Sequence, residues 1–406
     1  MALAYKNLSD IVTLSRASAR TRTSSAGVLT TLASGIFGID YSPSTLAVRG
    51  MPVEEQRTNS IRNNTMVDAV AGSPGTRPTN WGSGWTGLNQ GLQLSIAGVG
   101  VESGINYVDV NIAGTSTSTT AIGCTFEAST QTAAVSGQTW TGGFYARLIA
   151  GARGNLAIGL QITERDAGGS SVAASSVTAL TPTTAALATQ RANQTYTLVN
   201  GSTAFVTHQL RIAGDGASTY DVTIRIGMPQ FELGAFASSV IATTGAAAAT
   251  RLADSLTVGT LSPWFNATEG TIYIEATGVQ NSGGAQLVSV DDGTTANRII
   301  PNVTSAGTSV VYRAVAGSSD VVNVSAGSIA ALATFKVAIA YKANDFAASL
   351  NGAAAVTDVS GAVPTGLTNV KLGANVSGSA HINGHLRKII FYPSRKTNAE
   401  LVTMST

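Results

Sequence analysis

The sequence predicts an all-β protein in which an irregular N-terminal attachment region is followed by two antiparallel β-sandwich domains of the jelly-roll type. Charged residues make up only 11% of the chain, which favours short strands and tight turns over amphipathic helices with Glu/Lys pairs. Apolar and polar residues alternate over much of the length, as in half-buried strands. At 406 residues the chain exceeds one ordinary hydrophobic core, so several domains are expected.

Residues 1–80 form the predicted attachment region. This segment lacks regular alternation and has few large apolar side chains, so it cannot bury much apolar surface by itself. We therefore expect it to acquire its order by packing on other subunits.

The first predicted sandwich spans residues 81–245. Val108, Val110 and Ile112 share one face of a strand in this region, whereas Tyr107 and Asp109 take the other face. The same period of two recurs in later runs, and Gly-Gly, Asp-Gly and Asn-Gly steps between the runs are typical of hairpin turns. This pattern predicts one antiparallel sandwich.

The second predicted sandwich spans residues 246–406 and follows an Ala-rich stretch with the composition of a linker. Phe335, Val337 and Ile339 mark an alternating strand, and the last strand ends at Tyr392, before Pro393. A single helical turn is expected over residues 397–402.

Two phrases of the sequence carry a resemblance to known proteins. One runs Pro229-Gln-Phe-Glu-Leu-Gly-Ala-Phe-Ala-Ser-Ser-Val-Ile241 and is followed by Thr250-Arg-Leu-Ala-Asp254. The other runs Arg49-Gly-Met-Pro-Val-Glu-Glu-Gln-Arg-Thr-Asn59 and is preceded by Leu14-Ser-Arg-Ala-Ser18. Together they resemble a seam in the spike and fibre proteins, head spikes or tail fibres, of tailed phages and phage-like gene transfer agents. At that seam a sugar-binding β-sandwich ends and the next module begins.

Each predicted sandwich has a resemblance of its own. The first resembles carbohydrate-binding modules. The second resembles concanavalin A-like and laminin G-like domains, through Glu269-Gly-Thr-Ile-Tyr-Ile274, the Asn383-Gly384 turn and the closing Phe391-Tyr392-Pro393.

The resemblance implies a structural virion protein that is not an enzyme. Its sandwiches would bind host capsular polysaccharide or lipopolysaccharide, while its attachment region contacts other virion proteins. It would act as a homo-oligomer, a trimer ahead of a pentamer, because several weak sugar sites on one shaft gain avidity. It would be assembled in the bacterial cytoplasm and would lie on the surface of the virion. The candidate attachment residues are Arg16, Arg49, Glu54, Glu55 and Arg57.

Two alternative functions stay open at this point. One is a depolymerase that cleaves the same surface polysaccharide. The other is a capsid decoration protein that stabilises the particle and binds no sugar.

A sugar site needs an aromatic platform and a few fixed polar groups. Trp81 and Trp85 lie in a Gly/Ser/Asn-rich stretch that does not force both rings to be buried, so one of them is a candidate platform. Packing between the attachment region and the first sandwich is the alternative for these rings. In the second sandwich the candidates are Asp291, Asp292, Arg298 and Asn302, with Tyr312 as a platform.

Catalytic residues are not indicated. Glu54 and Glu55 are adjacent, as are Asp291 and Asp292, and neighbours in extended backbone point to opposite faces. Neither pair therefore supplies two carboxylates that flank a glycosidic bond.

The three histidines also favour structural roles. His208 alternates in register with apolar residues, which predicts a buried, hydrogen-bonded core position. His381 and His385 flank a predicted turn, but no third metal ligand accompanies them. We expect neither a metal nor another cofactor.

Charge and hydropathy exclude two classes of partner. The net charge is +2 and no Lys/Arg run is interleaved with aromatic residues, so nucleic acid is not an expected ligand. No uninterrupted apolar window approaches ~18 residues, so membrane insertion is not expected. The single cysteine, Cys124, excludes an intrachain disulfide and lies in an apolar setting typical of a buried thiol.

Overall fold

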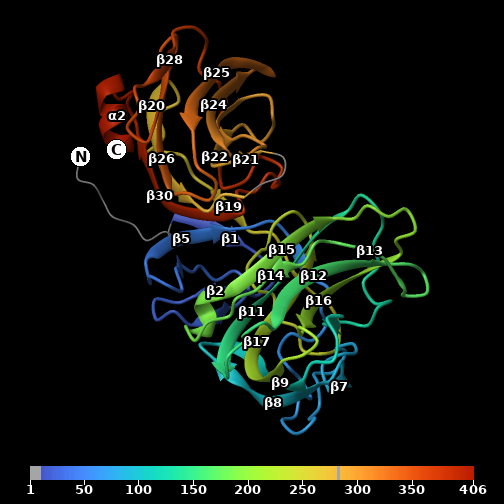
Figure 1. Ribbon diagram of the computed structural model, residues 1–406. Coiled ribbons are helices and arrows are strands. Elements are labelled where there is room, and N and C mark those ends of the chain that lie inside the picture. The colour runs from blue at the N-terminus through green and yellow to red at the C-terminus, as the bar shows by residue number, and fades with distance from the viewer. Residues whose placement is uncertain (1–10, 281–283) are drawn as a thin grey trace.

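The computed structural model describes residues 11–280 and 284–406. Regular structure in these residues is almost entirely β, which confirms the predicted fold class. Figure 1 shows two β modules in contact, one mainly green and yellow and the other mainly orange and red, with blue N-terminal strands at their junction. Among the described residues, no helix is long and apolar enough to cross a membrane.

The first sandwich consists of two antiparallel sheets on either side of one core. One sheet has the order β15-β11-β17-β9-β8-β7, and the other has the order β10-β16-β12-β13, with β14 also paired to β12. A short 3-10 helix, η1 (Leu187–Thr189), precedes β15. The strands are β7 (Gly87–Asn89), β8 (Leu92–Glu102), β9 (Ile105–Thr115), β10 (Ile122–Thr125), β11 (Thr139–Ala150), β12 (Ala157–Arg165), β13 (Ser171–Ala174), β14 (Thr178–Ala179), β15 (Arg191–Thr197), β16 (Phe205–Ala213) and β17 (Thr219–Leu233).

The core of the first sandwich is built from the alternating side chains that the sequence placed on one face. Val108 lies opposite Ile226 and Val110 lies opposite Ile224 in the β9–β17 pairing, and all four are buried. Their alternation gives each strand one apolar face, and the facing sheet covers it.

The second sandwich also has two antiparallel sheets. One has the order β1-β19-β29-β22-β23-β24-β25, with β21 paired to β23, and the other has the order β28-β27-β26-β20-β30-β5-β4. The strands from the second half of the chain are β19 (Ser255–Val258), β20 (Glu269–Thr277), β21 (Ala285–Gln286), β22 (Val288–Asp291), β23 (Arg298–Val303), β24 (Ser309–Ala316), β25 (Ser319–Ser328), β26 (Phe335–Lys342), β27 (Phe346–Leu350), β28 (Val356–Asp358), β29 (Asn369–Leu372) and β30 (Gly384–Tyr392).

Strands between residues 12 and 53 of the N-terminal segment belong to this second sandwich, whereas Ile61 and Met66 pack in the core of the first. Strand β1 (Val12–Ser15) pairs with β19, and β5 (Val48–Val53) pairs with β30, so each adds an edge to one of the two sheets. Strand β4 (Asp40–Tyr41) extends β5, and β2 (Arg20–Thr23) and β3 (Leu29–Leu32) form a hairpin. The segment is therefore ordered by packing on its own chain, where the sequence led us to expect other subunits.

The stretch between the two sandwiches also packs on the N-terminal segment. Strand β18 (Ala249–Arg251) pairs with β6 (Arg57–Asn59), and Asn64 exchanges two hydrogen bonds with Thr243. The small side chains of this linker allow its backbone to lie flat against residues 57–65.

The only α-helix among the described residues is α2 (Asn398–Ser405), which is longer than the single turn predicted. It covers the outer face of the second sandwich, where Leu401 is buried against Tyr273 and Ala338. A capping box starts the helix: the Thr397 hydroxyl accepts from the Glu400 N–H at 3.2 Å, and the Glu400 carboxylate accepts from the Thr397 N–H at 2.7 Å.

Replacing Thr397 with alanine removes the side-chain half of this capping box. We expect the free energy of unfolding to fall by about 1 kcal/mol, as for other N-cap substitutions. Thr403→Ala is the matched control, because Thr403 is exposed inside the same helix and alanine is the better helix former. Equal losses in the two variants, measured by urea unfolding, would contradict a specific role for the cap.

Candidate functional site

The two phrases singled out in the sequence meet at the junction between the sandwiches. The Asn59 side chain donates to the Ile241 carbonyl at 3.0 Å and accepts from the Phe231 N–H at 3.0 Å. The Arg57 guanidinium lies over the Phe236 ring, 4.5 Å from its centroid. Gly234 has φ +143°, and a Cβ there would collide with that guanidinium, so the position requires glycine. The phrases therefore fasten the end of the first sandwich to the N-terminal segment.

A buried ionic network lies at the centre of this junction. Asp254 accepts from Arg16 at 2.9 Å, from Arg20 at 2.8 Å and from the Glu54 N–H at 2.9 Å. Glu54 accepts in turn from Arg20 at 2.6 Å and from both the N–H and the hydroxyl of Ser239 at 2.8 Å. Four segments that are distant in sequence are held together by these contacts.

Glu54 is ionised within this network. Burial alone would raise the pKa of its carboxyl, but the charges of Arg251 and Arg20 and the hydrogen bonds from Ser239 outweigh burial and hold the pKa well below its usual value. The carboxylate is therefore a fixed negative charge at ordinary pH and has no proton to donate.

Most of the candidate attachment residues have partners inside the chain. Arg16 and Glu54 belong to the ionic network, and Arg57 pairs with Glu55 at 2.5 Å while it donates to the Leu233 carbonyl. Arg49 differs, because it is exposed and has no ion pair among the described residues. Of the five, only Arg49 presents an uncommitted charge.

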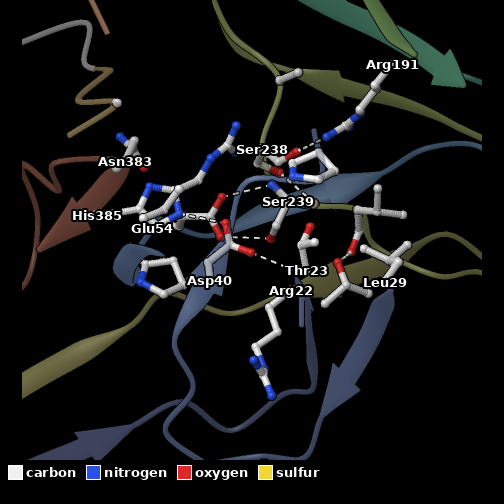
Figure 2. A pocket seen from close by; sticks show the side chains of 18 of the residues that line it. Arg22, Thr23, Leu29, Asp40, Glu54, Arg191, Ser238, Ser239, Asn383 and His385 are labelled. Carbon is white, nitrogen blue, oxygen red and sulfur yellow. Dashed lines mark hydrogen bonds and ion pairs between the residues drawn. The ribbon is translucent and has the colours of Figure 1, made fainter. Parts of the chain in front are cut away.

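A cavity of about 550 Å³ opens beside the network, and Figure 2 shows the side chains that surround it. Its wall comes from the N-terminal segment, from β11 and β15 of the first sandwich, from the stretch after β17, and from β20 and β30 of the second sandwich. A volume of this size is in the range of small-molecule and oligosaccharide sites. Neither sandwich forms the cavity alone.

The wall of the cavity contains more positively charged than negatively charged side chains. Among the described residues that line it, four are arginines and two are carboxylates. Glu54 is neutralised as described, and Asp40 accepts from the Thr23 N–H at 2.7 Å and contacts Nε2 of His385 at 2.8 Å. The cavity therefore keeps an excess of positive charge.

Arg191 and Tyr145 occupy the side of the cavity formed by the first sandwich. Arg191 donates through Nη1 to the Ser238 carbonyl at 2.8 Å, and its guanidinium lies 5.9 Å from the Tyr145 ring centroid. Burial raises the pKa of Tyr145, an effect that the charges of Arg191 and Arg49 oppose and that of Asp40 reinforces. The Tyr145 phenol thus lies within the electrostatic reach of all three charged side chains.

The tryptophans considered as sugar platforms are buried. Trp81 is 3% exposed and Trp85 is not exposed, and their indole N–H groups donate to the Asn63 and Thr125 carbonyls at 2.7 and 2.6 Å. Trp81 borders a second hollow of about 370 Å³, but its ring packs against Trp85 at a centroid distance of 4.5 Å. The sugar-facing role proposed for these rings is therefore wrong, and the packing alternative describes them.

Candidates in the second sandwich are not brought together around a hollow. Asp291 and Tyr312 are buried, and the Asp292 carboxylate accepts hydrogen bonds from Thr294 and Asn297 inside its own turn. Burial raises the pKa of Tyr312 far above its usual value, as expected of a core phenol. Arg298 and Asn302 are partly buried on β23. None of these residues lines the cavity at the junction.

The predictions for the histidines and for Cys124 are confirmed only in part. His208 is buried as expected, but neither ring nitrogen has a hydrogen-bond partner, contrary to expectation. Cys124 is buried, and burial raises the pKa of its thiol to about 12. The rings of His381 and His385 diverge, one toward the Asp254 carbonyl and the other toward Asp40. Within the described residues, no three His, Cys, Asp or Glu side chains cluster as metal ligands.

Sequence reasoning missed the residues that surround the cavity, apart from Arg49 and Glu54. Asp40, Tyr145, Arg191 and His385 come from four separate segments and share no local motif. The available signal was the seam resemblance itself, because a junction between modules is a common position for a ligand site.

Comparison with known proteins gives a fold-level result. No family model matches the chain, and no curated protein matches it. Among solved structures, the chain is similar to the CBM40 module of the Ruminococcus gnavus IT-sialidase bound to α2,3 sialyllactose, with 18% identity over 34% of this chain and 83% of that one, at a TM-score of 0.31. It is also similar to domains LG4-5 of the mouse laminin α1 chain, with 10% identity over 65% of this chain and 87% of that one, at a TM-score of 0.26.

A third similar structure is the tandem CBM22 domain of Xyn10C from Paenibacillus barcinonensis, with 11% identity over 80% of this chain and 98% of that one, at a TM-score of 0.22. At these identities and TM-scores the similarity concerns sandwich architecture alone. No site residue of this chain is assigned from it.

Proposed function

We propose that the protein is a structural spike or fibre subunit of a tailed phage or phage-like gene transfer agent, and that it binds a cell-surface polysaccharide in the cavity between its two sandwiches. The observation that supports binding most directly is that cavity, about 550 Å³ in volume and lined by residues of both modules. The spike or fibre role is supported by the resemblance of the two phrases that meet beside it.

The chemistry of the wall suits a saccharide. Thr189, Asn193 and Gln280 offer hydroxyl and amide groups to sugar hydroxyls, and Phe236 is a partly exposed ring in the same wall. Sugars are held by such combinations of short polar groups and an aromatic surface. Binding to a host capsule or lipopolysaccharide would therefore use the junction rather than the tryptophans of the first sandwich.

Binding without cleavage is the form of this proposal that the carboxylates favour. Hydrolysis of a glycosidic bond uses one protonated and one ionised carboxyl on either side of that bond. In the cavity, Glu54 is kept ionised by Arg20 and Arg251, and Asp40 is engaged by Thr23 and His385. A hydrolytic depolymerase would need a free acid that these pairings do not supply.

The test of polysaccharide binding is an array of bacterial capsular polysaccharides and lipopolysaccharides probed with the purified full chain, with release of reducing ends assayed in the same samples. We expect binding without release. Release would identify a depolymerase, and the absence of both would contradict the proposed binding. Asn193→Trp, which places a bulky ring in the cavity from an exposed position on β15, should abolish binding, whereas Ser325→Trp, at an exposed position on β25 outside the cavity, should not.

The virion role is tested separately, on particles that lack the protein, and the homotrimer by measuring the mass of the purified protein in solution. We expect such particles to remain intact and to attach less to host cells. Normal attachment combined with easier breakage would instead identify a decoration protein.

A further inference from the structure

We infer that the cavity between the sandwiches selects an acidic saccharide, whose carboxylate is held between Arg49 and Arg191 beside the Tyr145 hydroxyl. The inference rests on the proposed polysaccharide binding and specifies the chemical class of the sugar. It is carried by the distribution of charge and of unused hydrogen-bond donors in the cavity wall.

The first step concerns the two carboxylates of the cavity wall, neither of which forms an ion pair with Arg49 or Arg191. Glu54 is shared by Arg20 and Arg251, and Asp40 contacts Thr23 and His385. Neither Arg49 nor Arg191 has a carboxylate partner among the described residues. Neither guanidinium is therefore paired with a carboxylate. Arg49 is exposed, whereas Arg191 is partly buried.

The second step concerns the donors of Arg191. Its Nη1 donates to the Ser238 carbonyl, whereas Nε and Nη2 are buried and have no partner among the described residues. Nε and Nη2 form one edge of the guanidinium, the edge that accepts a carboxylate through two parallel hydrogen bonds. Buried donors without an acceptor cost free energy, so a ligand carboxylate would relieve that cost as well as the charge.

The third step concerns the remaining groups that face this position. Arg49, Asp40 and Arg191 line the same cavity as Tyr145, and the Arg191 guanidinium lies 5.9 Å from the centroid of the Tyr145 ring. The Tyr145 hydroxyl has no hydrogen-bond partner among the described residues and remains able to donate. Arg22 donates to the Ile39 carbonyl at 2.6 Å and points away from the other labelled side chains in Figure 2, so it is not part of the proposed contact.

A neutral sugar does not use this arrangement. Its hydroxyls accept hydrogen bonds but leave both positive charges uncompensated, whereas a uronic or other sugar acid neutralises them. Arginine is also suited to the planar carboxylate, because its fork of donors matches the two oxygens.

The experiment uses each polysaccharide that binds on the array, before and after its carboxyl groups are reduced to primary alcohols. We expect reduction to weaken binding by at least about tenfold, the effect of losing a hydrogen bond to a charged group. Arg191→Gln and Arg49→Gln should each cause a similar loss with the acidic polymer and little change with the reduced one. Arg153→Gln is the matched control, because it removes the same charge outside the cavity.

The outcomes separate this inference from the proposed function. Equal binding before and after reduction, with no effect of the Arg191 and Arg49 variants, would leave polysaccharide binding intact and overturn the selection of an acid. If Arg153→Gln weakened binding as much as Arg49→Gln and Arg191→Gln, binding would depend on the net charge of the protein. That result would also overturn the proposed carboxylate site. No binding to any acidic or neutral polysaccharide would overturn the proposed function and this inference together. Thermal unfolding of each variant confirms that it is folded before its affinity is compared.

Discussion

Replacing Asp254 with alanine is expected to lower the free energy of unfolding by about 3–5 kcal/mol, because it leaves the buried Arg16 guanidinium without its counter-ion and removes one of the two carboxylates that pair with Arg20. The Asp254 side chain is fully buried and pairs with Arg16 and Arg20, whose side chains are 1% and 3% exposed. Removing one partner of a buried pair exposes the full desolvation cost of the others. The same substitution also removes the acceptor of the Glu54 N–H.

Urea unfolding followed by circular dichroism measures this loss, and Asp320→Ala provides the control. Asp320 also pairs with an arginine, Arg313 at 2.7 Å, but both side chains are about one third exposed. Exposed pairs contribute about 0–1 kcal/mol, so the control should change little. Comparable losses in the two variants would mean that a buried Asp254 network contributes no more to the free energy of unfolding than an exposed ion pair does. Asp254→Asn, which keeps an acceptor and loses the charge, should fall between the wild type and Asp254→Ala.

Acidification is expected to destabilise the first sandwich through His208. Burial lowers the pKa of this imidazole from 6.5 to about 3, so the folded state excludes a proton that the unfolded state binds below pH 6.5. The stability contributed by the neutral ring is complete above pH 6.5 and is lost as the pH falls from there toward 3. At pH 4.5 the loss amounts to about 3 kcal/mol, at roughly 1.4 kcal/mol for each unit of pKa difference.

His208→Leu isolates this effect. The ring lies among Phe126, Phe144 and Phe231, and neither of its nitrogens has a hydrogen-bond partner, so leucine removes the polar atoms without breaking a hydrogen bond. We expect the variant to lose less stability than the wild type between pH 7.5 and pH 4.5, measured by urea unfolding at both values. Parallel losses in the two proteins would show that other groups cause the acid sensitivity.

The strands of both sandwiches could be predicted because the alternation of apolar and polar residues is visible within each short stretch of sequence. The alternation around Val108 and Val110 reports which face is buried, since every second residue meets the same environment. His208 followed the same rule, and its burial was correctly predicted. Its missing hydrogen bonds were not, because the facing positions that surround it are aromatic and come from other strands.

The sequence did not predict which side chains are buried by, or brought together with, residues that lie far away in the chain. Trp81 and Trp85 lie among glycines and serines, and what buries them is Phe126 and the chain around residues 61–66, which no local pattern indicates. Strand β1 has only four residues and the burial of β5 does not alternate, and the partners of both strands lie in the second half of the chain. For the same reason the cavity could be found only when Asp40, Arg191 and His385 were placed in space.

The pairing of β1 with β19 and of β5 with β30 has a consequence for synthesis on the ribosome. Strand β1 can pair only after β19 (Ser255–Val258) has been made, and β5 can pair only after β30 (Gly384–Tyr392) has been made. Contacts between such distant segments form slowly, and the waiting edges invite pairing with a neighbouring nascent chain. Production of residues 255–406 alone would leave β19 and β30 with open edges, so the second sandwich is complete only when β1 and β5 have paired with it.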